Sequence, residues 1–448
     1  MEPEFKKNLI EIDRLSHKLG SPIYLVGGTL RDILATRPCT DFDFTSHQAP
    51  GIASAFAEQA GRKYIPLDET PGHETFRVVI HRDLYFDFTT LQGESIESDL
   101  TQRDFTINAM GLALPDYIEG KLNLIDPFRG QDDLKSHLVR VLPGPTFEDD
   151  PLRLLRAFRF AATLGFDIDP ETLQQITRHR SLIDRVAKER VTHELLILFS
   201  ADHSGFDLLD RTGLAQILFP EIARLKTATG HREGTSAWDD VLKRFRELES
   251  LIIEPGRFLD KHAALIKTFL SENRHRPMLK WSFLAGALYP GKEPSSSVTN
   301  GLKKFRLSNE DIHFAERTLR AAAPLISYPS SIEFGEDAAV YRWIKTGGQE
   351  SISALLLGLA YRLGNQEDIK LFTERVNRIL DFFIDRFQPM QDQPALLNGE
   401  VLKNKFKLSP SPLFRTILEQ VEEARVLGSI RTPEDAERLA RNIINSQT

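Results

Sequence analysis

Residues 23–45, IYLVGGTLRDILATRPCTDFDFT, decide how the N-terminal part of this chain folds. Their first apolar run ends at Gly27 and Gly28, and paired glycines allow a sharp backbone turn that a ligand can approach closely. Residues 29–34 have a helical character, and the first free N–H groups of a helix can bind an anion such as phosphate. We therefore expect a strand, a glycine turn, a helix and a second strand.

The second strand carries two carboxylates, Asp41 and Asp43, which are separated by Phe42. Alternate side chains of a strand share a face, so both carboxylates point the same way. A divalent cation commonly compensates such a pair, and oxygen ligands suit Mg²⁺. A phosphate-binding turn beside a magnesium site indicates nucleotide chemistry. Each motif alone also fits an ordinary turn with two solvated aspartates, whereas the ordered combination is more specific.

Composition narrows the class of protein. The 448 residues are enough for two or more domains, and 41% hydrophobic with 27% charged residues indicates a soluble globular protein. We expect no membrane span and no signal peptide, and a single cysteine, Cys39, favours a reducing cytoplasm. A net charge of -7 gives no global nucleic-acid signal, so any RNA contact must depend on local basic patches.

A β-hairpin is predicted next. Residues 76–80 (FRVVI) and 84–89 (LYFDFT) are rich in β-forming residues and are joined by a short polar turn. Asp87 lies in the second of these strands, and a third carboxylate beside the first pair would complete a two-metal site. A charge on the exposed face of a strand is an equally good interpretation of Asp87.

Two later segments carry polar groups suited to a nucleotide. Arg103 and Asp104 open an apolar run with helical spacing, and a guanidinium pairs with phosphate in a bidentate way. Asn108 could reach a sugar hydroxyl.

In residues 147–166, Asp150 precedes Pro151, which fits an N-cap followed by proline at the first helical position. Arg153, Arg156 and Arg159 recur every three residues and form a stripe. Such a stripe is often only a solvated face, but this one begins beside an aspartate pair.

Together these segments resemble the class II tRNA nucleotidyltransferase family, which includes CCA-adding, CC-adding and A-adding enzymes and bacterial poly(A) polymerases. The similar motifs cover about the first half of the chain, and five in the same order are far more specific than one. In chain order they are GGTLRD…DFD (27–43), RDFTINA (103–109), DPFRG (126–130), DDPLRLLRAFRF (149–160) and ERVTHEL (189–195).

The resemblance implies roles for these residues. Asp41, Asp43 and Asp87 would bind two Mg²⁺ ions and activate the RNA 3′-hydroxyl for attack on the α-phosphate, with pyrophosphate leaving. The other implied roles are triphosphate binding by Gly27, Gly28 and Arg31, ribose and nucleotide binding by Arg103, Asp104 and Asn108, and base selection by Asp150, Arg153, Arg156 and Arg159. An aspartate accepts from an exocyclic amine and an arginine donates to ring acceptors, so the pair can favour cytosine and adenine over uracil and guanine.

The chain also departs from the family pattern. Gln102 and Gln92 stand where members usually have arginine, Ile197 replaces a common lysine, and Asp149 replaces a glutamate. The connection over residues 90–103 is short, whereas CCA-adding members often have a longer flexible stretch there that is thought to help the switch from C to A.

The short connection favours a CC-adding enzyme, which would leave the final A to a separate A-adding enzyme. The poly(A) polymerase marker is only partly matched at residues 61–64, GRKY, so that interpretation ranks lower.

We therefore predict an α+β fold with three parts. Residues 1–135 would form a nucleotidyltransferase head with a small mixed sheet, residues 136–225 a helical neck that selects the base, and residues 226–448 a helical body and tail that contact tRNA. A degenerate HD-like segment is expected at 284–294, where Tyr289 and Pro290 replace the metal-binding His and Asp.

The predicted function is addition of CC to the 3′ end of tRNA from CTP, by a cytoplasmic protein with no membrane partner. The alternatives are a complete CCA-adding enzyme that uses CTP and ATP, an A-adding enzyme, or a bacterial poly(A) polymerase. A non-catalytic RNA-binding relative ranks last, because the carboxylate pair is intact.

Overall fold

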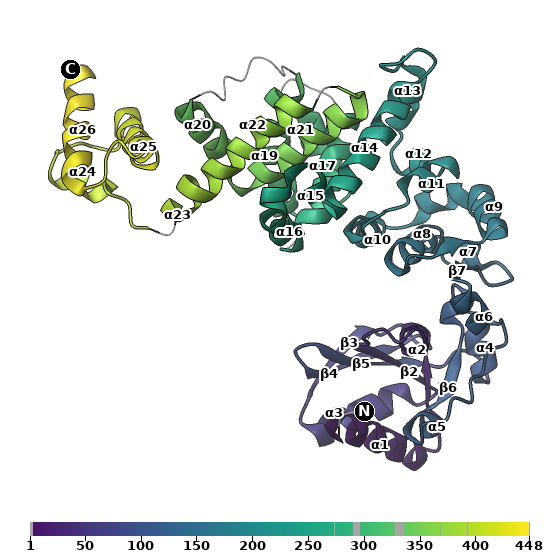
Figure 1. Cartoon of the computed structure of the whole chain (residues 1–448). Coiled ribbons are helices and arrows are strands. Elements are labelled where there is room, and N and C mark those ends of the chain that lie inside the picture. The colour runs from purple at the N-terminus through teal and green to yellow at the C-terminus, as the bar shows by residue number, and fades with distance from the viewer. Residues whose placement is uncertain are drawn as a thin grey trace. The chain divides into compact units, whose positions relative to one another are not determined.

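The computed structural model describes residues 3–272, 274–289, 296–327, 336–367, 369–391 and 393–447. The chain divides into two compact units (Figure 1). The first comprises Met1–Leu198 and Ser204–Leu218, and the second comprises Phe199–His203 and Phe219–Thr448.

The first unit begins with the predicted small mixed sheet, which has six strands in the order β3-β4-β5-β2-β1-β6. β2 and β5 are parallel, and the other neighbouring strands of this sheet are antiparallel. The predicted hairpin is confirmed as β4 and β5, whereas β3 and β6 were not expected. The strands are β1 (Tyr24–Val26), β2 (Asp41–Ser46), β3 (Lys63–Asp68), β4 (Thr75–His81), β5 (Leu84–Thr90) and β6 (Gly111–Ala113).

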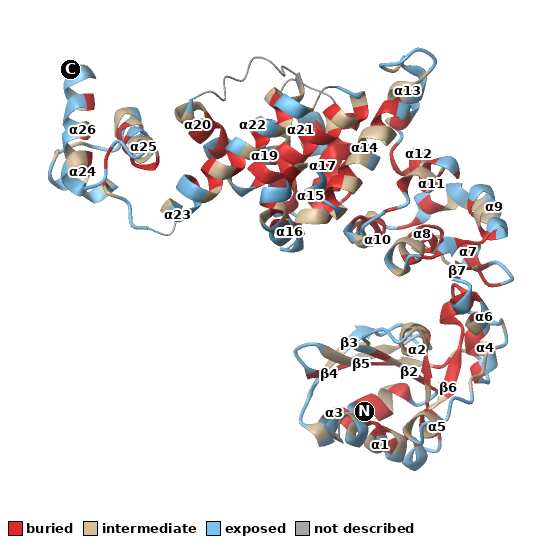
Figure 2. Ribbon diagram, in the orientation of Figure 1, coloured by how far each residue is buried: buried red, intermediate tan, exposed pale blue. Residues whose placement is uncertain are grey.

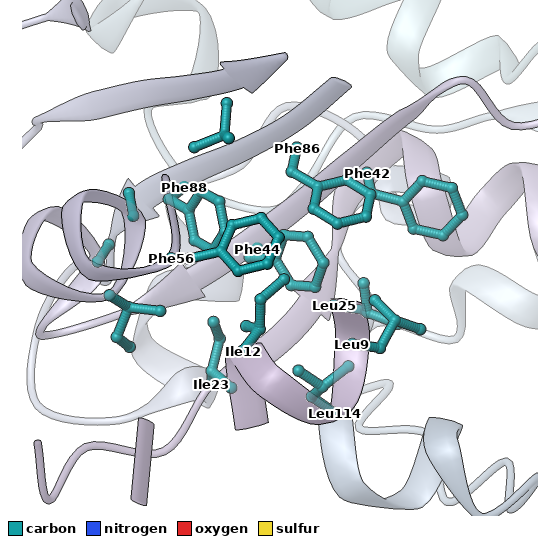
Figure 3. Close-up of a cluster of buried hydrophobic side chains, with 14 of the residues drawn as sticks. Leu9, Ile12, Ile23, Leu25, Phe42, Phe44, Phe56, Phe86, Phe88 and Leu114 are labelled. Atoms are coloured by element: carbon teal, nitrogen blue, oxygen red, sulfur yellow. The ribbon is translucent and has the colours of Figure 1, made fainter. Parts of the chain in front are cut away.

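One face of this sheet is the core of the head. Phe42 and Phe44 of β2 and Phe86 and Phe88 of β5 are each at most 5% exposed. Figure 3 shows them packed with Leu9 and Ile12 of helix α1 (Pro3–Lys18) and Phe56 of helix α3 (Ala49–Ala60). Full burial of one such side chain contributes about 2–3 kcal/mol, so this face determines the register of the strands. The aspartates between the phenylalanines must therefore lie on the other face.

Twelve α-helices begin in the first unit among its described residues. They are α1 (Pro3–Lys18), α2 (Gly27–Leu34), α3 (Ala49–Ala60), α4 (Ile96–Thr101), α5 (Leu114–Ile118), α6 (Gly130–Lys135), α7 (Thr146–Asp149), α8 (Arg153–Leu164), α9 (Pro170–His179), α10 (Lys188–Ser200), α11 (Phe206–Arg211) and α12 (Leu214–Leu218). A two-residue parallel pair, β7 (Leu138–Val139) with β8 (Asp167–Ile168), lies among them.

Two local predictions were wrong. The apolar run after Asp104 forms only a 3-10 turn, Thr106–Asn108, followed by β6. Pairing of β6 with β1 buries Leu112 completely, and this tertiary gain overrides the helical pattern. Asp150 is not the N-cap of α8, because the helix begins at Arg153 and Leu152 holds that position. Asp150 is extended, with φ -140° and ψ 97°, and its carboxylate accepts from the backbone N–H of Leu152 at 3.2 Å.

The second unit is built of helices, as the sequence predicts. They are α13 (Ile222–Thr227), α14 (Ala237–Ile253), α15 (Gly256–Leu259), α16 (Ala263–Ser271), α17 (His275–Leu288), α18 (Ser296–Lys304), α19 (Asn309–Ser327), α20 (Asp337–Gly347), α21 (Ser351–Asn365), α22 (Lys370–Phe382), α23 (Gln388–Gln391), α24 (Gly399–Asn404), α25 (Pro412–Val426) and α26 (Pro433–Gln447). Phe383–Phe387 form a π-helical turn.

The interior of this unit is formed by α17 and α21, which are buried along most of their length (Figure 2). Helices α24, α25 and α26 have a separate apolar core. In the HD-like segment, the hydroxyl of Tyr289 donates to Glu221 at 3.0 Å, whereas Pro290 lies outside the described residues. Over the part of the chain that the structure describes, every helix is too short or too polar to cross a bilayer.

Candidate active site

The carboxylates of the head meet where β2 and β5 lie side by side. Asp43 stands directly opposite Asp87 in the parallel register, and Asp41 stands opposite Tyr85. Burial raises the pKa of Asp43 to about 6, the Asp87 carboxylate adds to this rise, and Arg103 partly opposes it. The sheet therefore holds two acidic groups close together, as a cation site requires.

The glycine segment is fixed against these carboxylates. Helix α2 begins at Gly27, two residues earlier than predicted, and Gly27 has φ +64°. A Cβ atom built there would lie 3.3 Å from Oδ2 of Asp43 and 3.1 Å from Nη1 of Arg103, so the positive φ favours glycine and these side chains would have to shift to admit another residue. The hydroxyl of Thr29 accepts from the N–H of Asp43 at 2.6 Å and donates to the carbonyl of Asp41 at 3.2 Å.

Two predicted phosphate ligands are positioned by other side chains. Nη1 of Arg31 donates to Oδ1 of Asn108 at 2.8 Å, and Nε and Nη2 of Arg31 donate to Asp32 at 2.9 Å. Arg103 donates to Oδ2 of Asp99 through Nε at 3.1 Å and Nη2 at 2.8 Å. Its third guanidinium nitrogen, Nη1, lies next to Gly27.

Asp104 is a buried anion that organises the neighbouring side chains. Its carboxylate accepts from Nε of Arg156 at 2.9 Å, from Nη2 of Arg156 at 2.6 Å and from Nδ2 of Asn108 at 3.0 Å. Burial would raise the pKa of Asp104, but the guanidinium of Arg156 and the hydrogen bond from Asn108 lower the pKa to about 2. With its oxygens used in this way, Asp104 connects the head to α8.

The arginine stripe of α8 is not a solvated face. The guanidinium of Arg159 pairs with Glu194 of α10 at 2.6 Å, and that of Arg156 lies 3.5 Å from the same carboxylate. Phe160 packs against both guanidinium groups, at 3.8 Å from ring centroid to Arg159 and 5.1 Å to Arg156.

Arg153, by contrast, bonds to backbone carbonyls, those of Gln102 at 2.6 Å and Thr146 at 3.3 Å. Asp150 pairs with Arg190 at 3.0 Å.

The structure thus brings most of the predicted residues together in one unit. Gly27, Asp43 and Arg103 are in close approach, and a chain of contacts runs from Arg31 through Asn108 to Asp104 and on to α8. Arg153 joins this region through the carbonyl of Gln102, next to Arg103. No described contact of Asp150 reaches the carboxylates of β2 and β5.

Several residues of the site were missed from the sequence. The alternation of side chains in the hairpin could have identified Arg77, because Arg77 faces Asp87 across β4 and β5. Asp99 precedes Arg103 by four residues, a spacing at which helical side chains meet. For Glu194, the ERVTHEL motif was the only feature of the sequence that pointed to a role. Its contact with α8 joins two segments that no local sequence pattern connects.

The carboxylates of the sheet offer oxygen ligands that suit Mg²⁺. Asp41 and Asp43 share the open face of β2, and Mg²⁺ is commonly bound by one or two carboxylates together with substrate phosphates. Both oxygens of Asp87 accept from Arg77, at 2.8 and 2.7 Å. Across the described ranges, no three His, Cys, Asp or Glu side chains converge as ligands of one ion. The residues present fit a cation on Asp41 and Asp43.

Residues 23–140 match the model of the poly(A) polymerase head domain, and residues 165–226 match a model described as a probable RNA- and SrmB-binding site of polymerase A. The CCA-adding enzyme of Streptococcus pyogenes is 32% identical over 442 residues, which are 96% of this chain and 94% of that enzyme. The chain belongs to the tRNA nucleotidyltransferase and poly(A) polymerase family.

Other relatives are named for the addition of different nucleotides. The CC-adding tRNA nucleotidyltransferase of Geobacter sulfurreducens is 39% identical over 197 residues, 43% of this chain and 44% of that relative, so the match spans less than half of its length. The A-adding tRNA nucleotidyltransferase of Deinococcus radiodurans is 29% identical over 433 residues, 92% of this chain and 93% of that relative.

The fold of the family is also shared with the Thermotoga maritima CCA-adding enzyme in its complex with tRNA. That structure has a TM-score of 0.67 and 20% identity, and the superposition covers 100% of this chain and 97% of the other.

Proposed function

We propose that this chain transfers nucleotides to the 3′ end of tRNA, joining CMP from CTP to the terminal hydroxyl and releasing pyrophosphate. One observation carries this proposal: Asp41 and Asp43 share a sheet face beside the glycine start of α2, where Arg103 converges on the same point. A bound Mg²⁺ would polarise the phosphoryl oxygens and neutralise the charge that develops during transfer. CTP and ATP are carried over from the family as the candidate nucleotides.

The residues of this chain then have separate tasks. The first N–H groups of α2 and the guanidinium groups of Arg31 and Arg103 orient the triphosphate. Asn108 and Asp104 fix the arginines around the nucleotide, through the contacts described above.

Base selection we assign to Asp150 and Arg153, with Arg156 and Arg159 of the same stripe in support. Arg156 and Arg159 are compensated by Asp104 and Glu194, so they act mainly by positioning. Arg153 donates to the backbone carbonyls of Thr146 and Gln102 from Nη1 and Nη2, and a guanidinium has five N–H donors, so others remain for a base edge.

CC addition is favoured by the segment between β5 and Arg103. Residues 90–103 contain helix α4, whose N-cap Ser95 exchanges hydrogen bonds with Ser98 in a capping box. Ile96 and Leu100 of α4 are buried against Val26 and Leu91. A short segment that is capped and packed in this way lacks the length that the family resemblance associates with switching to A. The proposal therefore requires a separate A-adding enzyme to complete the tRNA.

Complete CCA addition is the second candidate. It is favoured by the alignment to the Streptococcus pyogenes enzyme, which covers 94% of that relative, whereas the alignment to the Geobacter sulfurreducens enzyme covers 44%. A-adding activity and poly(A) synthesis rank below these two.

A single set of reactions separates the candidates. The full chain is incubated with Mg²⁺ and either a tRNA transcript that ends before CCA or one that ends in CC, using CTP alone, ATP alone, or both. Growth by two residues with CTP and none after adding ATP supports CC addition, and growth by a third residue with both triphosphates supports CCA addition. Extension by one A only of tRNA that already ends in CC would identify an A-adding enzyme, and long A tails a polymerase. No incorporation in any reaction would refute the proposed function.

A further inference from the structure

A row of three charged side chains crosses the open face of the sheet. Arg77 of β4 stands directly opposite Asp87 of β5, and Asp87 stands directly opposite Asp43 of β2. Directly opposed side chains in neighbouring strands lie about 5 Å apart and interact. Arg77 was absent from the predicted site, yet it lies beside the carboxylates that the sequence assigns to metal.

The guanidinium of Arg77 binds both carboxylate oxygens of Asp87. Its Nε donates to Oδ1 of Asp87 at 2.8 Å and its Nη2 donates to Oδ2 at 2.7 Å, which is the bidentate geometry of a strong charge-assisted pair. The Asp87 side chain is 12% exposed, so few water molecules compete with this pair. The Tyr85 ring packs on the guanidinium at 4.8 Å and limits its movement.

The other two carboxylates are more available to a cation. Asp41 is 53% exposed, and its Oδ1 lies 3.6 Å from Nη2 of Arg77, beyond hydrogen-bonding distance. Asp43 accepts a long contact of 3.5 Å from the hydroxyl of Thr29. A cation that approached Asp87 would have to break the two hydrogen bonds from Arg77. At Asp41 it would meet only the longer ion pair of 3.6 Å with the same guanidinium.

We propose that Arg77 is a positioning residue that competes with the metal for Asp87, so that the free protein binds a divalent cation through Asp41 and Asp43 alone. This inference rests on the metal site of the proposed function. It assigns Asp87 a conditional role, in which the third carboxylate becomes a ligand only when Arg77 releases it. The ion pair also compensates Asp87, whose charge would otherwise lie unpaired beside Asp43.

Binding of Mn²⁺ to the full chain without nucleotide, followed by electron paramagnetic resonance, tests this proposal without measuring catalysis. Replacing Arg77→Ala should free Asp87 and tighten Mn²⁺ binding by about tenfold, because affinity for a divalent cation rises with the number of charged oxygen ligands. The double variant Arg77→Ala, Asp87→Asn should return to the wild-type affinity, because wild-type Asp87 contributes no ligand. Arg82→Ala removes the same charge from the exposed turn between β4 and β5 and should change the affinity less than twofold.

Two results would overturn the inference. Unchanged affinity in Arg77→Ala would show that Arg77 does not compete for Asp87. A double variant that binds Mn²⁺ more than tenfold more weakly than the wild type would show that Asp87 is already a ligand.

A different pattern tests the metal assignment itself. If Asp41→Asn and Asp43→Asn bind Mn²⁺ as the wild type does, the proposed metal site is wrong, whatever Arg77 does.

Arg77→Lys gives an independent test if Arg77→Ala does not fold. The lysine keeps the positive charge but cannot form the two parallel hydrogen bonds to Asp87. Mn²⁺ binding should then tighten by a smaller factor, about threefold, because Asp87 is only partly released as a ligand. That gain should disappear in the double variant Arg77→Lys, Asp87→Asn. An affinity equal to that of the wild type would refute competition, provided that circular dichroism shows the native helix content.

Discussion

Removal of Arg156 should destabilise the contact between the head and α8, because it leaves the carboxylate of Asp104 buried without its main partner. Asp104 is 6% exposed, and Arg156 donates two hydrogen bonds to its carboxylate, one from Nε and one from Nη2. Burial acts to raise the pKa of Asp104, yet Arg156 and Asn108 lower it from 3.8 to about 2. A pKa change of this size corresponds to about 2 kcal/mol of stability at neutral pH.

A double-mutant cycle with Asp104→Asn and Arg156→Met measures this coupling. In the wild-type background, Asp104→Asn should cost about 2 kcal/mol. In the Arg156→Met background the same replacement should be neutral or stabilising, because it removes an uncompensated buried charge. Hydrogen exchange of peptides covering residues 104–108 and 153–160 reports the local free energy of opening, which suits a chain of two units better than global unfolding.

Equal costs of Asp104→Asn in both backgrounds would refute the coupling. The exposed pair between Arg415 and Glu419 is the matched control, since its arginine side chain is 84% exposed and Arg415→Met should cost less than about 0.5 kcal/mol. The pH dependence is a second check. The pKa of Asp104 is lower in the folded state, so its contribution is present above pH 4 and is lost as the pH falls toward 2. The difference between wild type and Asp104→Asn should therefore disappear over that range.

Three further predictions concern catalysis. Asp41→Ala should abolish nucleotide transfer while tRNA binding survives, as measured by primer extension and filter binding, and wild-type extension would contradict the metal assignment. Arg153→Ala should relax the preference for CTP by about tenfold while tRNA affinity changes less, and an unchanged ratio of kcat/KM between CTP and UTP would exclude a role in base selection. Asp99→Asn should raise the KM for CTP about tenfold, because Asp99 accepts both hydrogen bonds that orient Arg103; Asp116→Asn, on α5, is the control and should leave KM unchanged.

Local patterns were sufficient for the central strands of the head. The alternation of phenylalanine and aspartate in β2 and β5 predicts both the buried face and the face with the carboxylates, since only one arrangement buries four aromatic rings. The hairpin followed from β-forming residues on either side of a polar turn. The family resemblance then added the roles of Arg103, Asp104 and the arginine stripe, which no spacing alone would have assigned.

Tertiary contacts explain what local patterns did not predict. The helix expected after Asp104 became a turn and a strand because β1 offers β6 an antiparallel partner. The solvated interpretation of the stripe was wrong because Glu194, 35 residues after Arg159 in the sequence, pairs with it. The ion pair between Arg77 and Asp87 depends on the register of β4 against β5. That register can be read from the sequence only after the two strands are known to pair.

The parallel pairing of β2 with β5 has a consequence for the order in which this protein is assembled. Asp43 and Asp87 are 44 positions apart in the sequence and become neighbours only after α3 and two further strands have crossed between them. Contacts of such sequence separation are slow to form, because a long loop must close first. During translation the acidic residues therefore remain apart until about the first ninety residues have emerged from the ribosome. A shorter nascent fragment contains the DFD motif but has no fifth strand against which to align it.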